Sequence, residues 1–463
     1  MTMTRRRFLS ATAALGAAAV WPGRGSAAPL PREADIVVIG AGAAGIAAAR
    51  RIAAAKRTVV VIEAMDRVGG RCVTDAATFA VPFDRGARWL YGADANPMIR
   101  LARGAGLEVA PTPPGQKLRI GRRNARAGET EDFLASLVRA NRAIDDAARG
   151  KADVAAAEAL PKDLGDWAGT VAFVLGPDAT GKDLRDLSVR DLSRGRDRLA
   201  PIGCRQGIGA LVAKLAEGLP VALSTPAQRV VWSRREVGVE TAMGRIAARA
   251  AIVTVSPDVL LSDRIAFTPG LPKRQFEAAG RLGLGSLDRI ALQLPGNPLG
   301  LSREEIVIER STDRRTASLV ADVGDSLLCT VDVAGGFGRE LSAQGEAAMV
   351  AFARDWLGSL YGGDAVARVE KSAATRWNAA PYIRGAISAA APGGQPSRGL
   401  LAEPFGNVFI AGEATHETLW GTVDGAWESG VRAADAALKA IGPEKAVVPP
   451  HKQKPRRRRR RAR

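Results

Sequence analysis

A glycine-rich turn near the amino end has the spacing of a phosphate-binding motif. Gly40, Gly42 and Gly45 form the pattern G-x-G-x-x-G between an apolar run of strand length and an alanine-rich stretch. In this pattern the first glycine permits a tight turn, the second lets the backbone approach a pyrophosphate, and the third lets the helix pack against the strand. The N-terminus of that helix offers free N–H groups to the phosphates. The motif therefore predicts a bound pyrophosphate.

The residues that follow strengthen this prediction, because a glycine motif alone also marks ordinary tight turns. A second apolar run, "TVVVIEA", ends in Glu63 and Ala64, close to the roughly 20-residue offset expected for a carboxylate that binds a ribose. In "DRVGGRC", paired glycines lie between Arg67 and Arg71, which suits a loop that approaches a phosphate. Strand, glycines, helix, second strand and acid together predict a dinucleotide-binding domain.

A third segment with this character closes the chain at residues 407–438, "NVFIAGEATHETLWGTVDGAWESGVRAADAAL". Here a strand ends at Gly412, and Glu413 follows at its carboxyl edge, where it could hold a ligand hydroxyl. A helix is predicted to begin near Thr422 and Val423, and its N-terminus would stabilise negative charge on a ligand.

Four apolar, β-rich runs are far apart in the sequence, at residues 35–40, 58–64, 250–257 and 407–414. If all four belong to one sheet, the domain is discontinuous and other material is inserted between its pieces. The predicted fold is α/β, with a discontinuous Rossmann-like domain, a helical insertion and an α+β substrate-binding domain. The expected boundaries are 34–105, 201–268 and 397–442 for the nucleotide-binding domain, 106–200 for the mainly helical insertion, and 269–396 for the substrate domain.

Composition indicates a globular protein of 463 residues, with 46% hydrophobic and 25% charged residues. The net charge of +18 comes mainly from the two ends. Four arginines and no acid lie in residues 1–28, and ten basic residues against Glu444 lie in residues 443–463, which leaves only +5 for the body. The high charge is therefore poor evidence for nucleic-acid binding, and none is expected.

The amino end resembles a twin-arginine export signal, with paired arginines before Phe8, a short apolar stretch to Val20 and small residues up to Ala28. It predicts export to the periplasm or beyond; an uncleaved anchor or a basic amphipathic helix is the alternative. Residues 443–463 are expected to be a disordered basic tail, with contact to anionic surfaces as a second role. The three cysteines are too few for a disulfide framework.

The combination of motifs over residues 34–440 resembles the flavin-containing amine oxidase family, which includes monoamine oxidases, polyamine oxidases, flavin histone demethylases and related amino-acid oxidases. Besides the segments above, "FDRGARWLYG" at 83–92, "IAFTPGLP" and "RWNAAPYIRGAIS" carry the resemblance. It implies bound FAD and no metal. The implied FAD contacts are Gly40, Gly42, Ala43, Ala44, Gly45, Glu63, Ala64, Gly70, Arg71, Gly86, Ala87, Arg88, Trp89, Val230, Gly412, Glu413, Thr422 and Val423.

The resemblance also implies the reaction. A hydride leaves the carbon beside a neutral amine for the flavin, the imine is hydrolysed, and dioxygen becomes hydrogen peroxide. The implied catalytic residues are Arg289, Trp420 and Thr422. Arg289 takes the place of a lysine that in many members holds a water near the flavin, so slow reaction with oxygen is expected.

Other positions depart from the family pattern. The two aromatic residues that enclose the substrate in monoamine oxidases correspond here to Ile387 and Thr422, and a cysteine that binds flavin covalently in some members corresponds to Ala386, so FAD is expected to be non-covalent. The remaining candidate pocket aromatics, which could equally be packing residues, are Trp89, Tyr91, Trp377, Tyr382 and Trp420.

Two other functions stay open. An L-amino-acid oxidase or tryptophan 2-monooxygenase would need an arginine for the substrate carboxylate, and Arg88 and Arg384 are the candidates. A flavin-binding module without oxidase activity is suggested by Arg289, the missing aromatic pair and the basic tail.

Overall fold

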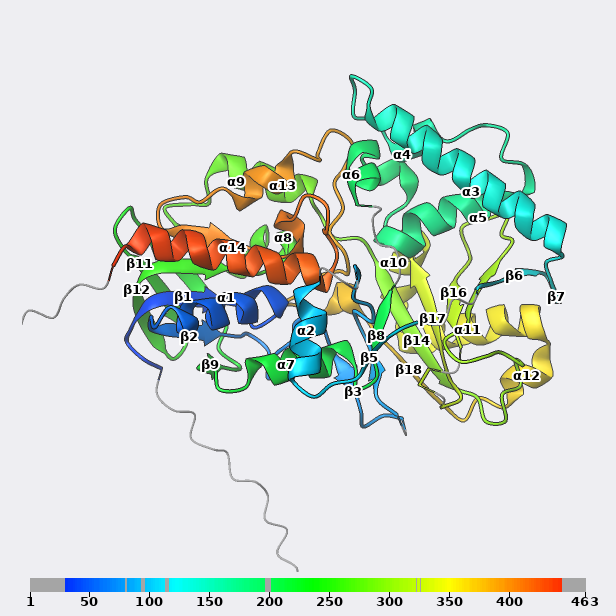
Figure 1. The fold of residues 1–463 in the computed structure, drawn as a ribbon, viewed down its shortest axis with the longest axis horizontal. Helices are drawn as coiled ribbons and strands as arrows, with labels where there is room; N and C mark the ends of the chain where they lie inside the picture. The colour runs from blue at the N-terminus through cyan, green and yellow to red at the C-terminus, as the bar shows by residue number, and fades with distance from the viewer. Residues whose placement is uncertain are drawn as a thin grey trace, which may run out of the picture.

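The computed structural model describes residues 30–79, 81–92, 96–112, 116–195, 201–321, 323–324 and 326–443. The predicted export signal and the basic tail after residue 443 lie outside the described residues. The molecule is elongated and has two large sheets, one toward each end (Figure 1).

The first sheet contains the predicted nucleotide-binding strands. Its order is β13-β10-β11-β12-β1-β2-β9, and β19 pairs with β12. The strands are β1 (Glu33–Ile39), β2 (Val59–Ile62), β9 (Val221–Ala222), β10 (Ala227–Trp232), β11 (Val237–Thr241), β12 (Gly244–Val253), β13 (Ala266–Thr268) and β19 (Val408–Ile410). Because β12, β1, β2 and β19 are parallel neighbours, the four separated runs do form one sheet, as predicted.

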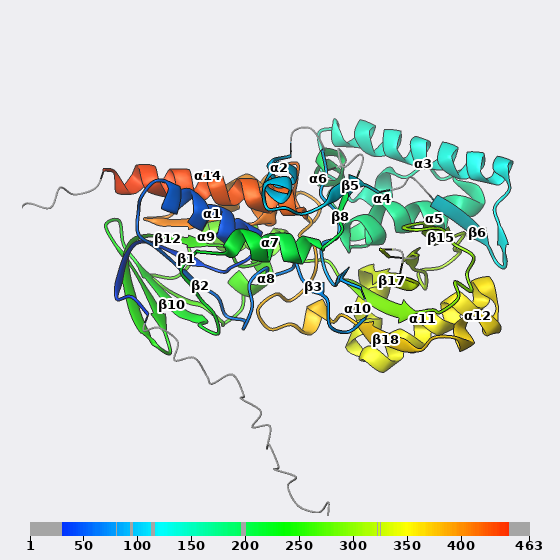
Figure 2. The same cartoon turned by 60° about the horizontal axis from the view of Figure 1, so that its bottom comes forward.

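Both faces of β1 are covered, which explains its continuous apolar sequence. Ile36 and Val38 pack on one side with α1 (Ala43–Ala54) and α14 (Val423–Ile441), whereas Val37 and Ile39 belong to the core on the other side, which includes α9 (Lys273–Arg281) and α13 (Ser397–Ala402). Figure 2 shows α14 and α1 stacked above the sheet. The remaining helices of this half are α2 (Pro97–Gly104), α7 (Ile208–Ala216) and α8 (Pro257–Leu260).

The second sheet has the order β18-β14-β17-β16-β15-β6-β7. Its strands are β6 (Gln116–Ile120), β7 (Arg123–Asn124), β14 (Leu287–Gln293), β15 (Ile306–Glu309), β16 (Ser318–Val320), β17 (Leu328–Ala334) and β18 (Lys371–Ala374). Ile290 of β14 and Val331 of β17 pack in one core with α10 (Gly335–Ala343) and α11 (Glu346–Tyr361), near α12 (Gly363–Ala367). Successive strand residues alternate between faces, so Arg289 and Asp332 point to the opposite side.

In the insertion predicted at 106–200, the elements between residues 127 and 195 are all helices, but those of its first part are strands. It begins with β5 (Val109–Pro111), β6 and β7, and then contains α3 (Ala127–Ala148), α4 (Ala156–Ala159), η1 (Gly165–Trp167), α5 (Ala168–Phe173), η2 (Val174–Asp178), η3 (Leu184–Asp186) and α6 (Val189–Arg194). β6 pairs in parallel with β15 and antiparallel with β7, so these two strands extend the second sheet, whereas β5 pairs with β8. The smaller elements are β3 (Thr74–Asp75), β4 (Phe83–Asp84), β8 (Ile202–Cys204), η4 (Trp377–Ala379) and η5 (Glu413–Thr415).

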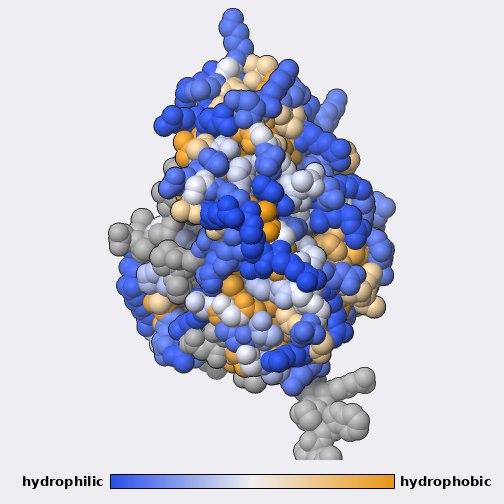
Figure 3. Space-filling view, turned by 90° about the vertical axis from the view of Figure 1, so that its right-hand side faces the viewer, coloured by the Kyte–Doolittle hydropathy of each residue, from blue (hydrophilic) through white to orange (hydrophobic). Residues whose placement is uncertain are grey.

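The end of the molecule that carries the second sheet is mostly hydrophilic, with apolar residues interspersed (Figure 3). Among the described residues, no helix combines the length and the apolar character that a membrane crossing requires. No disulfide bond joins Cys72, Cys204 and Cys329 in the structure.

Candidate active site

A cavity of about 510 Å³ connects the first sheet to the second. Its wall begins at the glycine turn after β1, passes the end of β2 and the loop at 69–72, and reaches β14 and β17 of the second sheet. Parts of residues 383–387 and 412–426 complete it. The cavity is therefore built from segments that are far apart in the sequence.

The three motif glycines have different roles. A Cβ at Gly45 would lie 1.9 Å from the carbonyl oxygen of Gly40, so Gly45 allows α1 to pack on the turn, and Gly40 itself has φ of +105°. A Cβ at Gly42 would meet nothing closer than the carbonyl oxygen of Gly69 at 3.9 Å. Gly42 is the N-cap of α1 and supplies no side chain to the free N–H groups of the first turn. These groups face a cavity that suits a phosphate.

Glu63 lies at the end of β2 and is 5% exposed. Its Oε2 accepts a hydrogen bond from the Ala41 N–H at 2.7 Å, and Oε1 accepts one from the Met65 N–H at 2.8 Å. Burial penalises the charge and raises the pKa of Glu63. Each oxygen keeps acceptor capacity for a ligand hydroxyl at the cavity wall.

The two arginines of the 66–72 loop differ in position. Arg67 Nη1 donates to the carbonyl oxygens of Val68 and Gly70, so it braces its own loop. Arg71 lines the cavity, and its Nη1 donates to the Ala386 carbonyl at 2.5 Å and to Glu413 Oε1 at 2.8 Å. Of these two arginines, Arg71 is therefore the one that brings positive charge to the cavity.

Glu413 is buried at the cavity wall. Burial opposes its ionisation, but the Arg71 guanidinium and the Ser388 hydroxyl outweigh that effect and hold the pKa of Glu413 below its usual value. Its carboxylate is therefore anionic and bound by protein donors.

Arg289 lies beside the cavity but is committed to protein groups. Its Nε and Nη2 donate to Asp332 Oδ1 and Oδ2 at 2.8 and 2.9 Å, and its Nη1 donates to the carbonyls of Asp84 and Gly86. Burial raises the pKa of Asp332, yet Arg289 and Arg88 together lower it below the usual value. The guanidinium thus ties β14 to β17 and to the wall segment at Gly86.

Arg88 shares the same carboxylate, since its Nη2 donates to Asp332 Oδ2 at 2.7 Å. Burial, and then the charge of Arg289, lower the pKa of Arg88 to about 10. Arg384, the other candidate for a substrate carboxylate, is exposed and does not line the cavity. Within the described residues, Arg88 is already paired with Asp332 and Arg384 lies outside the cavity, so neither offers a free cation to a substrate carboxylate.

Asp178 also lines this end of the cavity. It ends η2, and its Oδ1 accepts a hydrogen bond from the Ser318 hydroxyl at 2.6 Å. Burial raises the pKa of Asp178 to about 6; the charge of Asp332 adds to this rise and that of Arg88 opposes it. No ion pair to Asp178 occurs among the described residues, which distinguishes it from Asp332.

Most residues predicted as FAD contacts line the cavity: Gly40, Gly42, Ala43, Ala44, Glu63, Ala64, Gly70, Arg71, Gly86, Ala87, Arg88, Trp89, Gly412, Glu413, Thr422 and Val423. Two do not. Gly45 packs under the turn, and Val230 is fully buried within β10, where it pairs with Val239 and Phe267. The cavity instead meets the chain at Pro226 and Ala227, where this strand begins.

The predicted aromatic and catalytic positions divide similarly. Trp89, Tyr91, Trp377 and Tyr382 line the cavity, as do Ile387 and Thr422. Trp420 is 1% exposed and does not line it, because its ring packs over the Arg398 guanidinium at 4.7 Å. The Thr422 hydroxyl caps α14 by accepting from the Gly425 N–H and donating to the Leu419 carbonyl.

Sequence reasoning missed Asp178, Ser318 and Asp332. Asp332 had a signal, a carboxylate between Val331 and Val333 in a mainly apolar strand. Asp178 had none, because its role depends on a contact with Ser318, 140 residues away.

The cavity fits FAD on the structure's own evidence. It joins uncapped N–H groups and the open space at Gly42 to a buried carboxylate at Glu63 and a cation at Arg71. Among the described residues no cluster of histidine, cysteine or carboxylate side chains could hold a metal ion.

Comparisons with known proteins agree with this fit. The model of a family described as flavin containing amine oxidoreductase matches residues 43–187 and 149–438. The human "Lysine-specific histone demethylase 2" is 28% identical over 438 residues, which are 86% of this chain but only 53% of that protein. "Probable polyamine oxidase 4" of Arabidopsis thaliana is 26% identical, and the match covers 88% of each chain. The chain thus spans about half the length of the demethylase it matches.

Solved structures share the fold. Putrescine oxidase bound to putrescine matches with a TM-score of 0.73 and 18% identity over 87% of this chain and 98% of that one. Cyclohexylamine oxidase from Brevibacterium oxydans IH-35A matches with a TM-score of 0.73 and 20% identity over the same shares.

Replacing Gly42 by valine should abolish FAD binding without unfolding the apoprotein, because a side chain there has room against the protein but occupies the space before α1. FAD titration followed by flavin fluorescence, with a thermal melt of the apoprotein, measures both effects.

Gly45→Val is the matched control. Its side chain would collide with the Gly40 backbone, so the melting temperature of the apoprotein itself should fall. Normal FAD affinity in Gly42→Val would show that the pyrophosphate lies elsewhere.

Proposed function

Because the chain belongs to the flavin-containing amine oxidoreductase family, and is thus an FAD-dependent flavoprotein, we propose that it oxidises a small amine in the cavity between its two sheets. The observation that carries the proposal is the continuity of this cavity, which runs from the phosphate-binding turn, past the aromatic side chains of its wall, to Arg289 and Asp332 on the second sheet. A nucleotide and a small substrate can therefore share one enclosure.

The chain's own residues hold and surround the reacting groups. The N-terminus of α1 would bind the pyrophosphate and Glu63 a ribose hydroxyl. FAD, when bound, accepts the hydride from the carbon beside the amine. Trp89, Trp377 and Tyr382 line the cavity and exclude water from it.

Non-covalent FAD agrees with the chemistry of the wall. Ala386 has no nucleophile, and Cys72, the cysteine among the described lining residues, has its pKa raised to about 12 by burial. Its thiol stays protonated at neutral pH, and a thiol in that state is a poor nucleophile.

Amino-acid oxidation is the less favoured alternative. It would need an arginine free to bind the substrate carboxylate, and Arg88 already donates to Asp332. Asp178 instead favours a positively charged group on the substrate. Anaerobic reduction of the bound flavin, followed by its absorbance against a panel of amines and amino acids, tests the proposal, and reduction by amino acids alone would overturn it.

Asp178→Asn should lower kcat/KM for putrescine by about tenfold or more, because it removes the charge that faces a second ammonium. Butylamine, which has the same carbon chain and one amine, should be affected much less. The ratio of kcat/KM for putrescine to kcat/KM for butylamine is the measurement, because a change that affects both substrates equally leaves this ratio unaltered.

The same ratio should depend on pH. Because burial raises the pKa of Asp178 to about 6, its carboxylate is ionised above that pH and neutral below it. The preference for putrescine should therefore fall as pH drops through about 6, and Asp178→Asn should show no such change. If Asp178→Asn keeps the wild-type preference for putrescine over butylamine, Asp178 has a purely structural role.

Dioxygen is the proposed acceptor, and Arg289 is expected to make that step slow because its donors are occupied by Asp332 and two carbonyls. Arg289→Lys can satisfy fewer of these partners and leaves an ammonium proton for a water. Stopped-flow measurement should show faster reoxidation by oxygen and a nearly unchanged reductive step. Equal oxygen rates would mean that Arg289 serves only to pack the wall.

Export through the twin-arginine route is a further part of the proposal, supported by the sequence of residues 1–28 alone. Replacing Arg5 and Arg6 together by lysine should leave the precursor in the cytoplasm, because that route requires the arginine pair rather than charge. Cell fractionation measures the effect, and unchanged export would indicate another route.

A further inference from the structure

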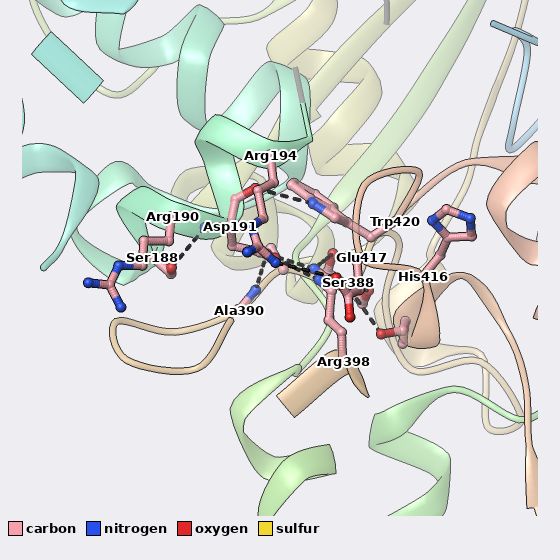
Figure 4. Close-up of polar contacts among 12 residues, drawn as sticks. Ser188, Arg190, Asp191, Arg194, Ser388, Ala390, Arg398, His416, Glu417 and Trp420 are labelled. Carbon is pink, nitrogen blue, oxygen red and sulfur yellow. Dashed lines mark hydrogen bonds and ion pairs between the residues drawn. The ribbon is translucent and has the colours of Figure 1, made fainter. Parts of the chain in front are cut away.

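A fully buried ion pair lies behind the cavity wall and joins two parts of the chain. Asp191 of α6 and Arg398 of α13 are both 0% exposed. Arg398 Nε donates to Asp191 Oδ1 and Nη2 to Oδ2, each at 2.6 Å (Figure 4). The pair therefore connects the helical insertion to the last piece of the nucleotide-binding domain.

The guanidinium also holds the segment that follows the cavity wall. Arg398 Nη1 donates to the Ser388 hydroxyl oxygen and to the Ala414 carbonyl, both at 3.1 Å, and Nη2 donates to the Ser388 carbonyl at 3.3 Å. The Trp420 ring covers the guanidinium, and its Nε1 donates to the Asp191 carbonyl at 3.3 Å (Figure 4). Arg398 is thus held from several directions.

This arrangement fixes the proton of Ser388. An arginine can only donate hydrogen bonds, so the Ser388 oxygen accepts from Arg398 and must direct its single proton elsewhere. That proton goes to Glu413 Oε2 at 2.5 Å. Glu413 Oε2 also accepts from the Gly421 N–H at 2.6 Å, and Oε1 accepts from Arg71.

The end of this chain of contacts is the cavity wall. Glu413, Arg71 and Gly421 line the cavity, and so does Ile387, which precedes Ser388. Apolar residues of similar volume are often as stabilising as a buried ion pair. The stability of the folded state therefore does not require charged residues at Asp191 and Arg398. The orientation of the Ser388 hydroxyl, in contrast, requires a hydrogen-bond donor at Arg398.

We propose that the Asp191–Arg398 pair is a positioning device for the flavin site. Through Ser388 it fixes the orientation and charge distribution of Glu413, and through Glu413 it fixes Arg71 and the Gly421 backbone at the cavity. Arg398 and Ser388 are positioning residues, and FAD affinity and potential depend on both. The inference does not depend on which amine is oxidised.

Ser388→Ala is the direct test, because it removes the proton donor to Glu413 and adds no volume. FAD affinity should fall by about tenfold, the effect of losing one hydrogen bond to a charged group. The midpoint potential of the bound flavin should also fall, because the less compensated charge of Glu413 disfavours added electrons. Ser136→Ala, which removes another buried hydroxyl from α3 outside the cavity wall, should change neither. Wild-type affinity and potential in Ser388→Ala would overturn the proposal.

A double variant separates positioning from folding. Arg398→Gln alone leaves Asp191 as an unpaired buried charge and should lower the melting temperature strongly. Adding Asp191→Asn removes that charge and should restore much of the stability. FAD affinity and potential should stay low, because glutamine can also accept a hydrogen bond and does not force the Ser388 proton toward Glu413. Recovery of affinity and potential together with stability would show that the pair is only structural.

Discussion

The burial of charged side chains between the two sheets is the constraint on which the rest of the structure depends. An unpaired buried charge costs several kcal/mol, so a wall that contains Glu413, Asp332 and Arg289 must supply partners from elsewhere in the chain. Glu413 takes them from Arg71 and Ser388, and Asp332 takes them from Arg289 and Arg88. Each requirement joins distant segments of the chain, and the contacts of Asp332 with Arg88 and of Arg289 with Asp84 and Gly86 also join the two halves of the molecule.

These cross-links help to hold together a discontinuous domain. The nucleotide-binding sheet takes strands from three parts of the chain, and the helical insertion returns to it through Asp191. Apolar packing covers both faces of β1, but it does not orient the polar side chains that line the cavity. The hydrogen bonds of Arg289 and Arg398 supply that orientation. Two glycines contribute in different ways. Gly45 is needed because α1 packs closely on the turn, whereas Gly42 leaves open space for a ligand.

Local patterns predicted much of the fold. Parallel strands buried on both faces are continuous apolar runs, and the glycine turn and the Thr422 cap have their own signatures. The same patterns predicted the residues that form the phosphate-binding turn. β6 and β7 were not foreseen: they form a short hairpin with each other, and β6 joins the second sheet only by pairing with β15, which lies far along the chain. The same applies to Asp178, the position of Val230 and the orientation of Trp420, which depend on tertiary contacts with no local counterpart in the sequence.

The order of the pieces along the chain also constrains how the protein is made. β1 must pair with β12, about two hundred residues later, and β19 and α14 complete the sheet and the cavity near the end of the described chain. Such long-range pairing is slow, and it cannot begin until the partner strand has left the ribosome. The insertion helices can begin to form during synthesis, because the hydrogen bonds within a helix are local, whereas the site for FAD closes only after translation is nearly finished. Cofactor loading is therefore a late, post-translational step, and until it occurs the apolar strands of the first sheet lack their final partners.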